Sequence, residues 1–240
     1  MTKSYAYDRE GALNSVEKAQ KALGRTYLDV MMLHEQESIH TLRGHDEALR
    51  TYIELKEQGV IGQVGVSTHF VECARAVAQM PQVDVLSTLL NMDGFGIVGG
   101  DISGMRKAIR LAHQNGKGVS IMKPLGGGHL SNHAKQALDF LLPMEEIHTI
   151  ALGMQSMEEV VCNLRYFQGN GEDALFEGTR MAPRTLHIAD WCVGCGNCIQ
   201  RCKQKALFMG QDQKVVVQEE LCVLCGYCAK VCPEFCMKVY

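Results

Sequence analysis

Short apolar runs alternate with longer amphipathic stretches through the first 168 residues of the chain. Runs of the length of a buried strand lie at residues 28–33, 61–66, 83–90, 119–122 and 148–152. Between them, apolar residues recur at helical spacing, which predicts helices at about 10–23, 46–58, 71–79, 101–115, 133–142 and 156–168. Mostly apolar strands that alternate with helices are typical of a parallel sheet covered by helices.

Each predicted strand is followed by a polar residue or a glycine. These residues are His34, Ser67, Asn91, Lys123 and Gly153. In a β/α barrel the carboxyl ends of the strands form the active-site face. We therefore expect these five residues to converge on one mouth.

The number of predicted strands falls short of a complete barrel. A (β/α)8 barrel takes about 250 residues, whereas the alternation here stops near residue 168 and provides five strands plus a stub at Thr2-Lys3. We predict an α/β fold, a partial (β/α)8 TIM-type barrel that lacks two or three units at its front. The gap lies between the stub and the strand at 148–152, and such open edges favour pairing with another chain.

Two cysteine runs of identical spacing lie near the C-terminus. Each reads C-x2-C-x2-C-x3-C: the first is Cys192, Cys195, Cys198 and Cys202, and the second is Cys222, Cys225, Cys228 and Cys232, followed by Pro233. Thiolates at every third residue hold three irons of a cubane cluster, and the fourth thiolate crosses to the other cluster. The runs predict two [4Fe–4S] clusters, one on Cys192, Cys195, Cys198 and Cys232 and the other on Cys222, Cys225, Cys228 and Cys202.

Zinc is the alternative ligand of these runs, because paired C-x2-C units also form four-thiolate zinc sites. A zinc site would leave the third step of each run without a role, so the spacing favours iron–sulfur clusters. Between the runs, residues 206–209 and 215–217 predict a small hairpin around Gly210. We expect a small α+β domain of the bacterial ferredoxin type at 181–240, after a barrel domain at 1–180.

Composition and charge narrow the setting in which the chain works. The formal net charge of −3 gives no electrostatic reason to expect a nucleic-acid partner. The N-terminus has no apolar signal-peptide core, and no run approaches the roughly 18 apolar residues that span a bilayer. Cluster cysteines require reduced thiols, so we expect a cytoplasmic protein without a membrane partner. The remaining Cys73, Cys162 and Cys236 are expected to be small buried hydrophobes.

Five motifs within residues 1–168 resemble those of the aldo-keto reductases. Three of them correspond to strands: residues 59–67 resemble the strand motif G-x-I-x-x-x-G-V-S, residues 27–34 resemble the strand that delivers the active-site His, and Thr2-Lys3 resembles the strand that supplies the active-site Lys. The other two include cofactor loops. Residues 123–130 resemble the loop that contacts the cofactor pyrophosphate, and residues 152–156 with Asn163 resemble the last strand and the adenosine-side loop. The whole is similar to aldo-keto-reductase-like oxidoreductases with a C-terminal ferredoxin-type domain. The resemblance implies catalytic roles for His34 and Lys3, and NAD(P)H contacts by Ser67, Lys123, Leu125, Gly126, Gly153, Ser156 and Asn163.

The chain also departs from the family's pattern. The catalytic Asp and Tyr of the family have no counterpart here, since Tyr5 and Tyr7 do not stand at the family's Tyr position. Thr68 replaces an Asn beside the nicotinamide, and Met122 stands where many members stack a Tyr. Glu159 stands where an Arg often meets the adenosine 2′-phosphate, which a carboxylate would repel. These departures oppose tight binding of NAD(P)H.

Three features have a structural interpretation beside the functional one. His34 is a catalytic residue or a satisfied polar residue at a strand end. Lys3 tunes the pKa of a Tyr in a complete site, or frays near a terminus. Residues 126–128, three glycines beside Lys123, form an anion-binding nest of amides or a plain flexible loop.

Two functions follow from these patterns. The first is an iron–sulfur oxidoreductase of the aldo-keto reductase-like group, which couples a barrel site to one-electron transfer through two [4Fe–4S] clusters. It would work with a redox partner protein or a small-molecule substrate. The alternative is an electron-transfer module whose barrel is a catalytically incomplete scaffold, which the missing Asp and Tyr favour.

Overall fold

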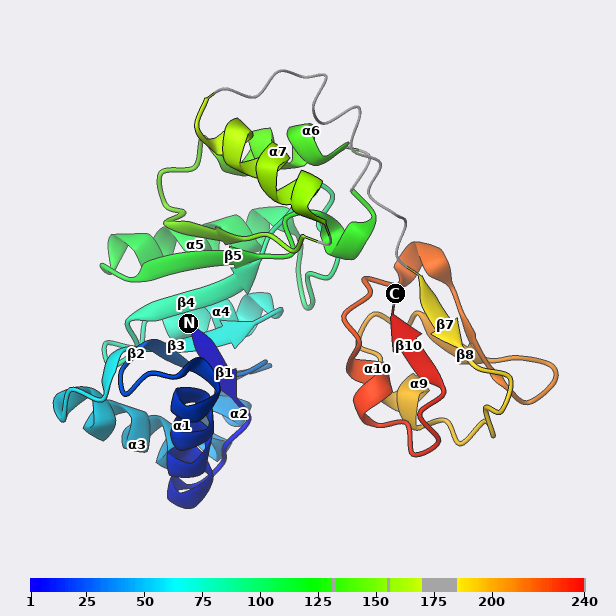
Figure 1. The fold of residues 1–240 in the computed structure, drawn as a ribbon, viewed down its shortest axis with the longest axis horizontal. Helices are drawn as coiled ribbons and strands as arrows, with labels where there is room; N and C mark the ends of the chain where they lie inside the picture. The colour runs from blue at the N-terminus through cyan, green and yellow to red at the C-terminus, as the bar shows by residue number, and fades with distance from the viewer. Residues whose placement is uncertain (131–132, 155, 170–184, 240) are drawn as a thin grey trace. The chain divides into compact units, whose positions relative to one another are not determined.

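The described residues form one parallel sheet of six strands (Figure 1). The computed structural model describes residues 1–130, 133–154, 156–169 and 185–239. The strands are β1 (Thr2–Ser4), β2 (Leu28–Leu33), β3 (Ile61–Thr68), β4 (Val85–Leu89), β5 (Gly118–Met122) and β6 (Thr149–Ala151). They pair in sequence order, and every pair is parallel. Within the described residues β1 and β6 do not pair with each other, so the predicted partial barrel is confirmed and is open.

The helices within residues 1–168 follow the predicted pattern with one addition. They are α1 (Arg9–Leu23), α2 (Ile39–Gly44), α3 (Asp46–Glu57), α4 (Val71–Ala78), α5 (Ile102–Gln114), α6 (Ala134–Leu141) and α7 (Met157–Phe167). Only α2 was not predicted. It begins with a capping box, in which the Ser38 hydroxyl accepts from the N–H of Thr41 and the Thr41 hydroxyl accepts from the N–H of Ser38. Its six residues are too few to show a helical period.

Helix ends are set by short-range hydrogen bonds that the sequence encodes. The Asp8 carboxylate caps α1 by accepting from the N–H of Gly11 at 2.7 Å, and α1 ends at Gly24, which has a φ of 63°. Asp101 caps α5 in the same way, accepting from the N–H of Gly104 at 2.7 Å. An Asp before the first turn and a left-handed Gly after the last satisfy backbone groups that a helix leaves unpaired.

The apolar strand residues form the core of the sheet. Met31, Met32 and Leu33 of β2 are almost fully buried, whereas Met122 at the end of β5 is half-buried. Tyr52 of α3 is also fully buried. Burying a methionine or leucine side chain, such as those of Met31, Met32 and Leu33, stabilises the fold by about 1.5–3 kcal/mol. The leftover cysteines Cys73, Cys162 and Cys236 are buried as well, as expected.

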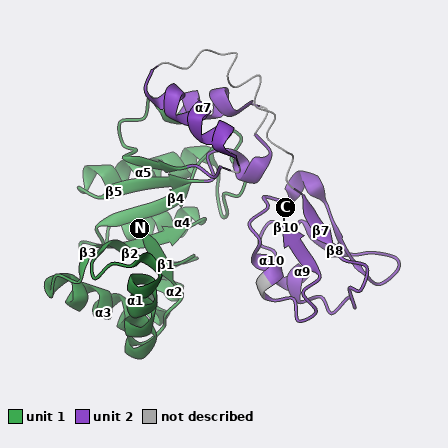
Figure 2. Cartoon of the chain, viewed as in Figure 1, with its two compact units in different colours: residues 1–122, 141–151 green, residues 123–140, 152–240 purple. Residues whose placement is uncertain are grey.

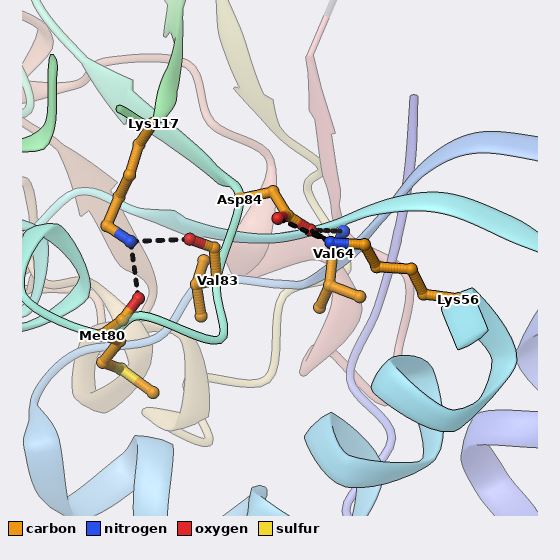
Figure 3. Close-up of polar contacts among 6 residues, drawn as sticks. All are labelled: Lys56, Val64, Met80, Val83, Asp84 and Lys117. Atoms are coloured by element: carbon orange, nitrogen blue, oxygen red, sulfur yellow. Dashed lines mark hydrogen bonds and ion pairs between the residues drawn. The ribbon is translucent and has the colours of Figure 1, made fainter. Parts of the chain in front are cut away.

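Charged side chains hold the loops at the amino end of the sheet (Figure 3). The Asp84 carboxylate accepts from Lys56 Nζ at 2.7 Å through both oxygens, and from the backbone N–H of Val64 at 2.9 Å. The Lys117 ammonium donates to the carbonyl oxygens of Met80 and Val83, at 2.5 and 2.6 Å. Burial lowers the pKa of Lys117, and Asp84 opposes that shift. These ion pairs and hydrogen bonds fix the loop that leads into β4.

The chain divides into two compact units (Figure 2). Unit 1 comprises residues 1–122 and 141–151 and contains the whole sheet. Unit 2 comprises residues 123–140 and 152–240, and it contains α6, α7 and the C-terminal module. The predicted domain boundary at residue 180 lies outside the described residues.

The C-terminal module of unit 2 is small and contains two antiparallel strand pairs. One is the predicted hairpin of β8 (Leu207–Met209) and β9 (Val215–Val217), which is confirmed. The other joins β7 (Leu186–Ile188) to β10 (Met237–Val239) and was not predicted. Each cysteine run contains one short helix, which includes the third cysteine of that run: α9 (Asn197–Arg201) in the first and α10 (Tyr227–Lys230) in the second. The 3₁₀ turn η3 (Glu219–Leu221) precedes the second run.

Candidate functional site

His34 lies at the carboxyl end of β2, in the position predicted for a barrel-site residue. Its Nδ1 is 2.9 Å from the hydroxyl oxygen of Ser67, which lies on β3 and is fully buried. The same hydroxyl accepts from the backbone N–H of Glu35 at 3.0 Å. Ser67 therefore fixes both the ring of His34 and the turn that follows β2.

Two residues that the sequence patterns did not mark as catalytic lie beside His34. The hydroxyl of Tyr5 donates to Glu35 Oε2 at 2.6 Å, and the ring centroids of Tyr5 and His34 are 4.6 Å apart. Glu35 has a φ of 52°, which is uncommon for a residue with a side chain. Their only signal in the sequence is position: Tyr5 lies two residues after Lys3, and Glu35 directly follows His34. Neither position matches a catalytic residue of the family.

Lys3 belongs to β1, where it pairs in register with Met32 of β2. Burial lowers the pKa of Lys3, although part of the side chain reaches solvent, and the Glu35 carboxylate opposes the shift. Tyr5, His34 and Glu35 thus form one polar group after β1 and β2, and the ammonium of Lys3 on β1 is close enough to the Glu35 carboxylate to feel its charge. An ammonium, a phenol, an imidazole and a carboxylate in such proximity are suited to proton transfer.

Two other polar residues at the strand ends have structural hydrogen bonds. The side chain of Asn91 donates to the carbonyl of Phe95 and accepts from its N–H, both at 2.9 Å. Thr68 is fully buried, and its hydroxyl donates to the carbonyl of Gln36 at 2.6 Å. These contacts order the loops that follow β2 and β4.

The glycine loop after β5 bonds largely to itself. It includes the 3₁₀ turn η1 (Gly126–Gly128). The N–H of Gly126 donates to the carbonyl of Lys123 at 3.0 Å, and the N–H of Gly128 donates to that of Leu125 at 2.9 Å. Two of the amides that an anion nest would use are therefore already engaged within the loop.

The other predicted cofactor contacts lie in unit 2, near the start of α7. Ser156 caps this helix by accepting from the N–H of Glu159 at 3.2 Å. Glu159 is buried, Asn163 is half-buried one turn further along, and Gly153 is exposed. Ser156 has a structural role that a cofactor contact would have to share.

The thiols of the first cysteine run lie close to one another. Burial raises the pKa of Cys198, and the thiols of Cys195 and Cys192 raise it further. The last cysteine of the second run adjoins this group: the N–H of Cys236 donates to Cys232 Sγ at 3.2 Å, and both Cys232 and Cys192 raise the pKa of Cys236 after the effect of burial. Cys232 and Cys192 therefore share a neighbourhood.

The thiols of the second run form the other group. Burial raises the pKa of Cys222, and Cys225 and Cys202 raise it further. Burial also raises the pKa of Cys228 to about 12, with added effects of Cys225 and Cys222. Cys198 of the first run also raises the pKa of Cys228. Cys202 of the first run lies near Cys222 of the second, and Cys232 and Cys192 both lie near Cys236, which is compatible with the predicted crossing of the fourth ligands.

The chemistry of these thiols fits iron–sulfur clusters. None of the eleven cysteines forms a disulfide, and burial raises the pKa of Cys198 and Cys228, which disfavours ionisation of these two thiols. Coordination to a metal reverses this, because a bound thiol is deprotonated outright. A cubane takes one thiolate at each of four separate irons, so the ligand set of each cluster is four cysteines. Within the described ranges, no group of three or more His, Cys, Asp or Glu side chains is placed so that it could hold a metal ion.

Glycines allow the backbone of each run to wrap around its thiols. Gly196 and Gly226 precede α9 and α10 with φ values of 76° and 73°. At Gly194, with a φ of 64°, a Cβ atom would lie 1.9 Å from the carbonyl oxygen of Gln213. A side chain at this position would therefore separate the first cysteine loop from the hairpin of β8 and β9.

Comparison with known proteins identifies both parts of the chain. A model described as the aldo/keto reductase family matches residues 1–168, and one described as a 4Fe-4S dicluster domain matches residues 191–236. No helix among the described residues is long and apolar enough to cross a bilayer.

Solved structures show the same fold. The holo form of an aldo-keto reductase from Bacillus halodurans superposes with a TM-score of 0.57 at 18% identity, over 73% of this chain and 68% of that one. Its apo form gives a TM-score of 0.55 over the same shares of the two chains, also at 18% identity.

A curated relative matches a shorter region. An uncharacterized polyferredoxin-like protein of Methanocaldococcus jannaschii is 31% identical over 83 residues, which cover 30% of this chain and 49% of the relative. The match thus spans about half the length of that protein.

Proposed function

The chain belongs to the aldo/keto reductase family, and from that premise we propose that it is an iron–sulfur oxidoreductase that couples a barrel site to one-electron transfer through two [4Fe–4S] clusters. The observation that carries the proposal is that Cys202 of the first run lies near Cys222 of the second, within a region that matches a 4Fe-4S dicluster domain. Exchange of the fourth ligand between two ferredoxin-type runs would put these two cysteines at one cluster.

In this proposal the protein holds the two clusters through its cysteines and shields the cysteine ligands from water. Each cluster, when bound, supplies a one-electron step. Cys192, Cys195, Cys198 and Cys232 would hold one cluster, and Cys222, Cys225, Cys228 and Cys202 the other. Burial of Cys198 and Cys228 keeps water from the ligands, and the N–H of Cys236 donates to the sulfur of Cys232. Solvent exposure and hydrogen bonds to sulfur set the potential of such clusters.

The polar group at the strand ends is our candidate for the barrel site. His34 would contribute the imidazole, oriented by Ser67, and Lys3 the ammonium. Tyr5, tied to Glu35, adds a phenol that could exchange a proton. A small-molecule substrate or a redox partner protein, in the reducing cytoplasm, is the source or acceptor of electrons in this proposal.

The second candidate function is an electron-transfer module with a catalytically incomplete barrel. The observation that favours it is that predicted NAD(P)H contacts are engaged in the protein itself. The amide of Gly126 bonds to Lys123, and the hydroxyl of Ser156 caps α7. Ser67, Leu125, Gly153 and Asn163 remain predicted contacts, but a nicotinamide would have to compete with these internal bonds.

Metal analysis after anaerobic purification tests the cluster proposal. We expect about eight irons and a matching amount of sulfide per chain, by the ligand count of two cubanes. The reduced protein should give the electron paramagnetic resonance signal of two interacting clusters. Zinc in place of iron, or iron bound equally well after Cys225→Ala, would contradict the proposal.

Reduction by nicotinamides separates the two candidate functions. NADH or NADPH is added anaerobically to the oxidised protein, and the visible absorption of the clusters is followed. Bleaching that His34→Ala abolishes would support the coupled oxidoreductase. Bleaching by a low-potential chemical donor but by neither nicotinamide would favour the electron-transfer module.

A further inference from the structure

The glycine loop after β5 approaches the backbone of the second cysteine run. Both segments belong to unit 2. Gly127 has a φ of 74°, and a Cβ atom built on it would lie 2.0 Å from the carbonyl oxygen of Val223. No side chain fits at that distance, so the contact requires glycine at position 127 on grounds of both conformation and space.

A second contact involves the neighbouring carbonyl. Nε2 of His129 hydrogen-bonds to the carbonyl oxygen of Cys222, and because a carbonyl only accepts, the imidazole N–H is the donor. Val223, the next residue, is buried. The loop thus holds two successive peptide groups of the cluster-binding run.

A third contact lies further along the same run, at Tyr227. The ammonium of Lys123 is 5.9 Å from the ring centroid of Tyr227, and the guanidinium of Arg201 is 5.3 Å from it. Cations within about 6 Å of an aromatic ring are attracted by its electrons. Tyr227 stands between Cys225 and Cys228, so this contact also touches the segment that carries the ligands.

These contacts favour a docking role for the glycine loop over an anion nest. The amides of Gly126 and Gly128 donate within the loop, which removes two of the donors that an anion would need. The close approach of Gly127 to Val223 gives a different reason for glycine there.

We propose that residues 123–130 are the docking seat of the segment from Cys222 to Tyr227, with Gly127 and His129 as positioning residues for the cluster on Cys222, Cys225 and Cys228. The inference rests on the proposed function and deepens it. The seat covers the Cys222–Val223 peptide and gives its carbonyl a hydrogen-bond donor. Since burial and hydrogen bonding around the ligands tune a cluster's potential, the docked cluster differs from its partner in potential and in sensitivity to oxygen.

Gly127→Ala tests the seat against a matched control. Gly59 has nearly the same φ, 75°, but a Cβ atom there meets nothing within 4 Å. Gly59→Ala therefore carries the same kind of backbone strain without a clash. In Gly127→Ala, hydrogen exchange of the amides of residues 222–228 should rise by about tenfold or more, and in Gly59→Ala it should stay as in the parent.

The cluster itself provides the second readout. In reduced Gly127→Ala the resonance signal and potential of one cluster should change while those of the other stay. His129→Leu should reproduce the change, and His129→Gln, which keeps an N–H donor, should restore the parent signal. This pair decides the question if Gly127→Ala does not fold.

The outcomes separate this inference from the proposed function. If the parent loads both clusters but Gly127→Ala and Gly59→Ala match in exchange and spectra, the docking seat is refuted and the proposed function stands. If the parent binds no iron, the proposed function fails. Exchange in residues 222–228 then still decides whether the seat exists, because it is measured on the amides rather than on the metal.

Discussion

Replacing Asp84 by alanine should destabilise unit 1, because one carboxylate satisfies two partners at the amino end of the sheet. It accepts from the backbone N–H of Val64, which is fully buried, and from the ammonium of Lys56. The alanine side chain cannot accept either hydrogen bond. The amide of Val64 would then be buried without an acceptor.

The two losses differ in size. A buried donor left unsatisfied costs about 1–3 kcal/mol. The ion pair is worth less, about 0.2–1 kcal/mol, because the side chains of Lys56 and Asp84 remain 35% and 24% exposed and solvent screens them. Together they lower the free energy of unfolding by about 1–4 kcal/mol. At about 2–4 °C per kcal/mol for a chain of this size, Tm should fall by about 2–16 °C.

Thermal unfolding followed by circular dichroism, under anaerobic conditions, measures the change. Asp84→Asn is the matched control, since its amide oxygen can still accept from Val64 and only the charge is lost. Its Tm should fall by less than half as much. If Asp84→Ala unfolds within about 1 °C of the parent, or if Asp84→Asn is equally damaging, the hydrogen bond to Val64 does not have the assigned weight.

Three further predictions concern the ligands, the pH dependence and the barrel site. Cys202→Ala should lower the iron content from about eight to about four per chain, with the second-run cluster lost; loss of the first-run cluster instead would refute the crossing. Burial lowers the pKa of Lys117 in the folded state. At pH values between the lowered pKa of the folded state and the ordinary lysine pKa of the unfolded state, the unfolded chain binds more protons, so the free energy of unfolding rises with pH. Lys117→Met should flatten this rise in alkaline denaturation curves, and an unchanged slope would count against it. The chain should show no ordinary NADPH-dependent aldehyde reduction, because the proton-donating Tyr of the family has no counterpart here and a positioned proton donor contributes about 10²–10⁴-fold to the rate. Robust aldehyde reduction that His34→Ala removes would overturn this.

The fold was predictable wherever the pattern extended over enough residues. The strand at 28–33 has the predicted bounds, because its apolar run is continuous and ends sharply at His34. The pair of β7 and β10 was not predicted, because each strand has three residues and its partner is about fifty residues away. A period of two is not visible in three residues.

Residues of the candidate site could be predicted from the sequence where their function depends on a regular spacing, as in the cysteine runs. The spacing of the cysteines alone predicts both ligand sets, because three ligands of each cluster lie within one run and the fourth comes from the other run; the ligand sets stay a prediction. Tyr5 and Glu35 could not be predicted, because their hydrogen bond depends on the left-handed turn at Glu35, which has no local sequence signal. The contact of Gly127 with Val223 joins segments almost a hundred residues apart, and a triple glycine alone does not reveal its neighbour.

The placement of Cys202 beside Cys222, and of Cys232 near Cys192, has a consequence for how the protein matures. Because each cluster would take ligands from both runs, neither run could complete its cluster until the other is in place. Filling one site draws a cysteine of the other run into place, so loading should be cooperative and half-filled molecules should be rare when iron is limiting. Loss of one cluster in air would free cysteines in both runs and so weaken the hold on the remaining cluster, without removing any of its four ligands.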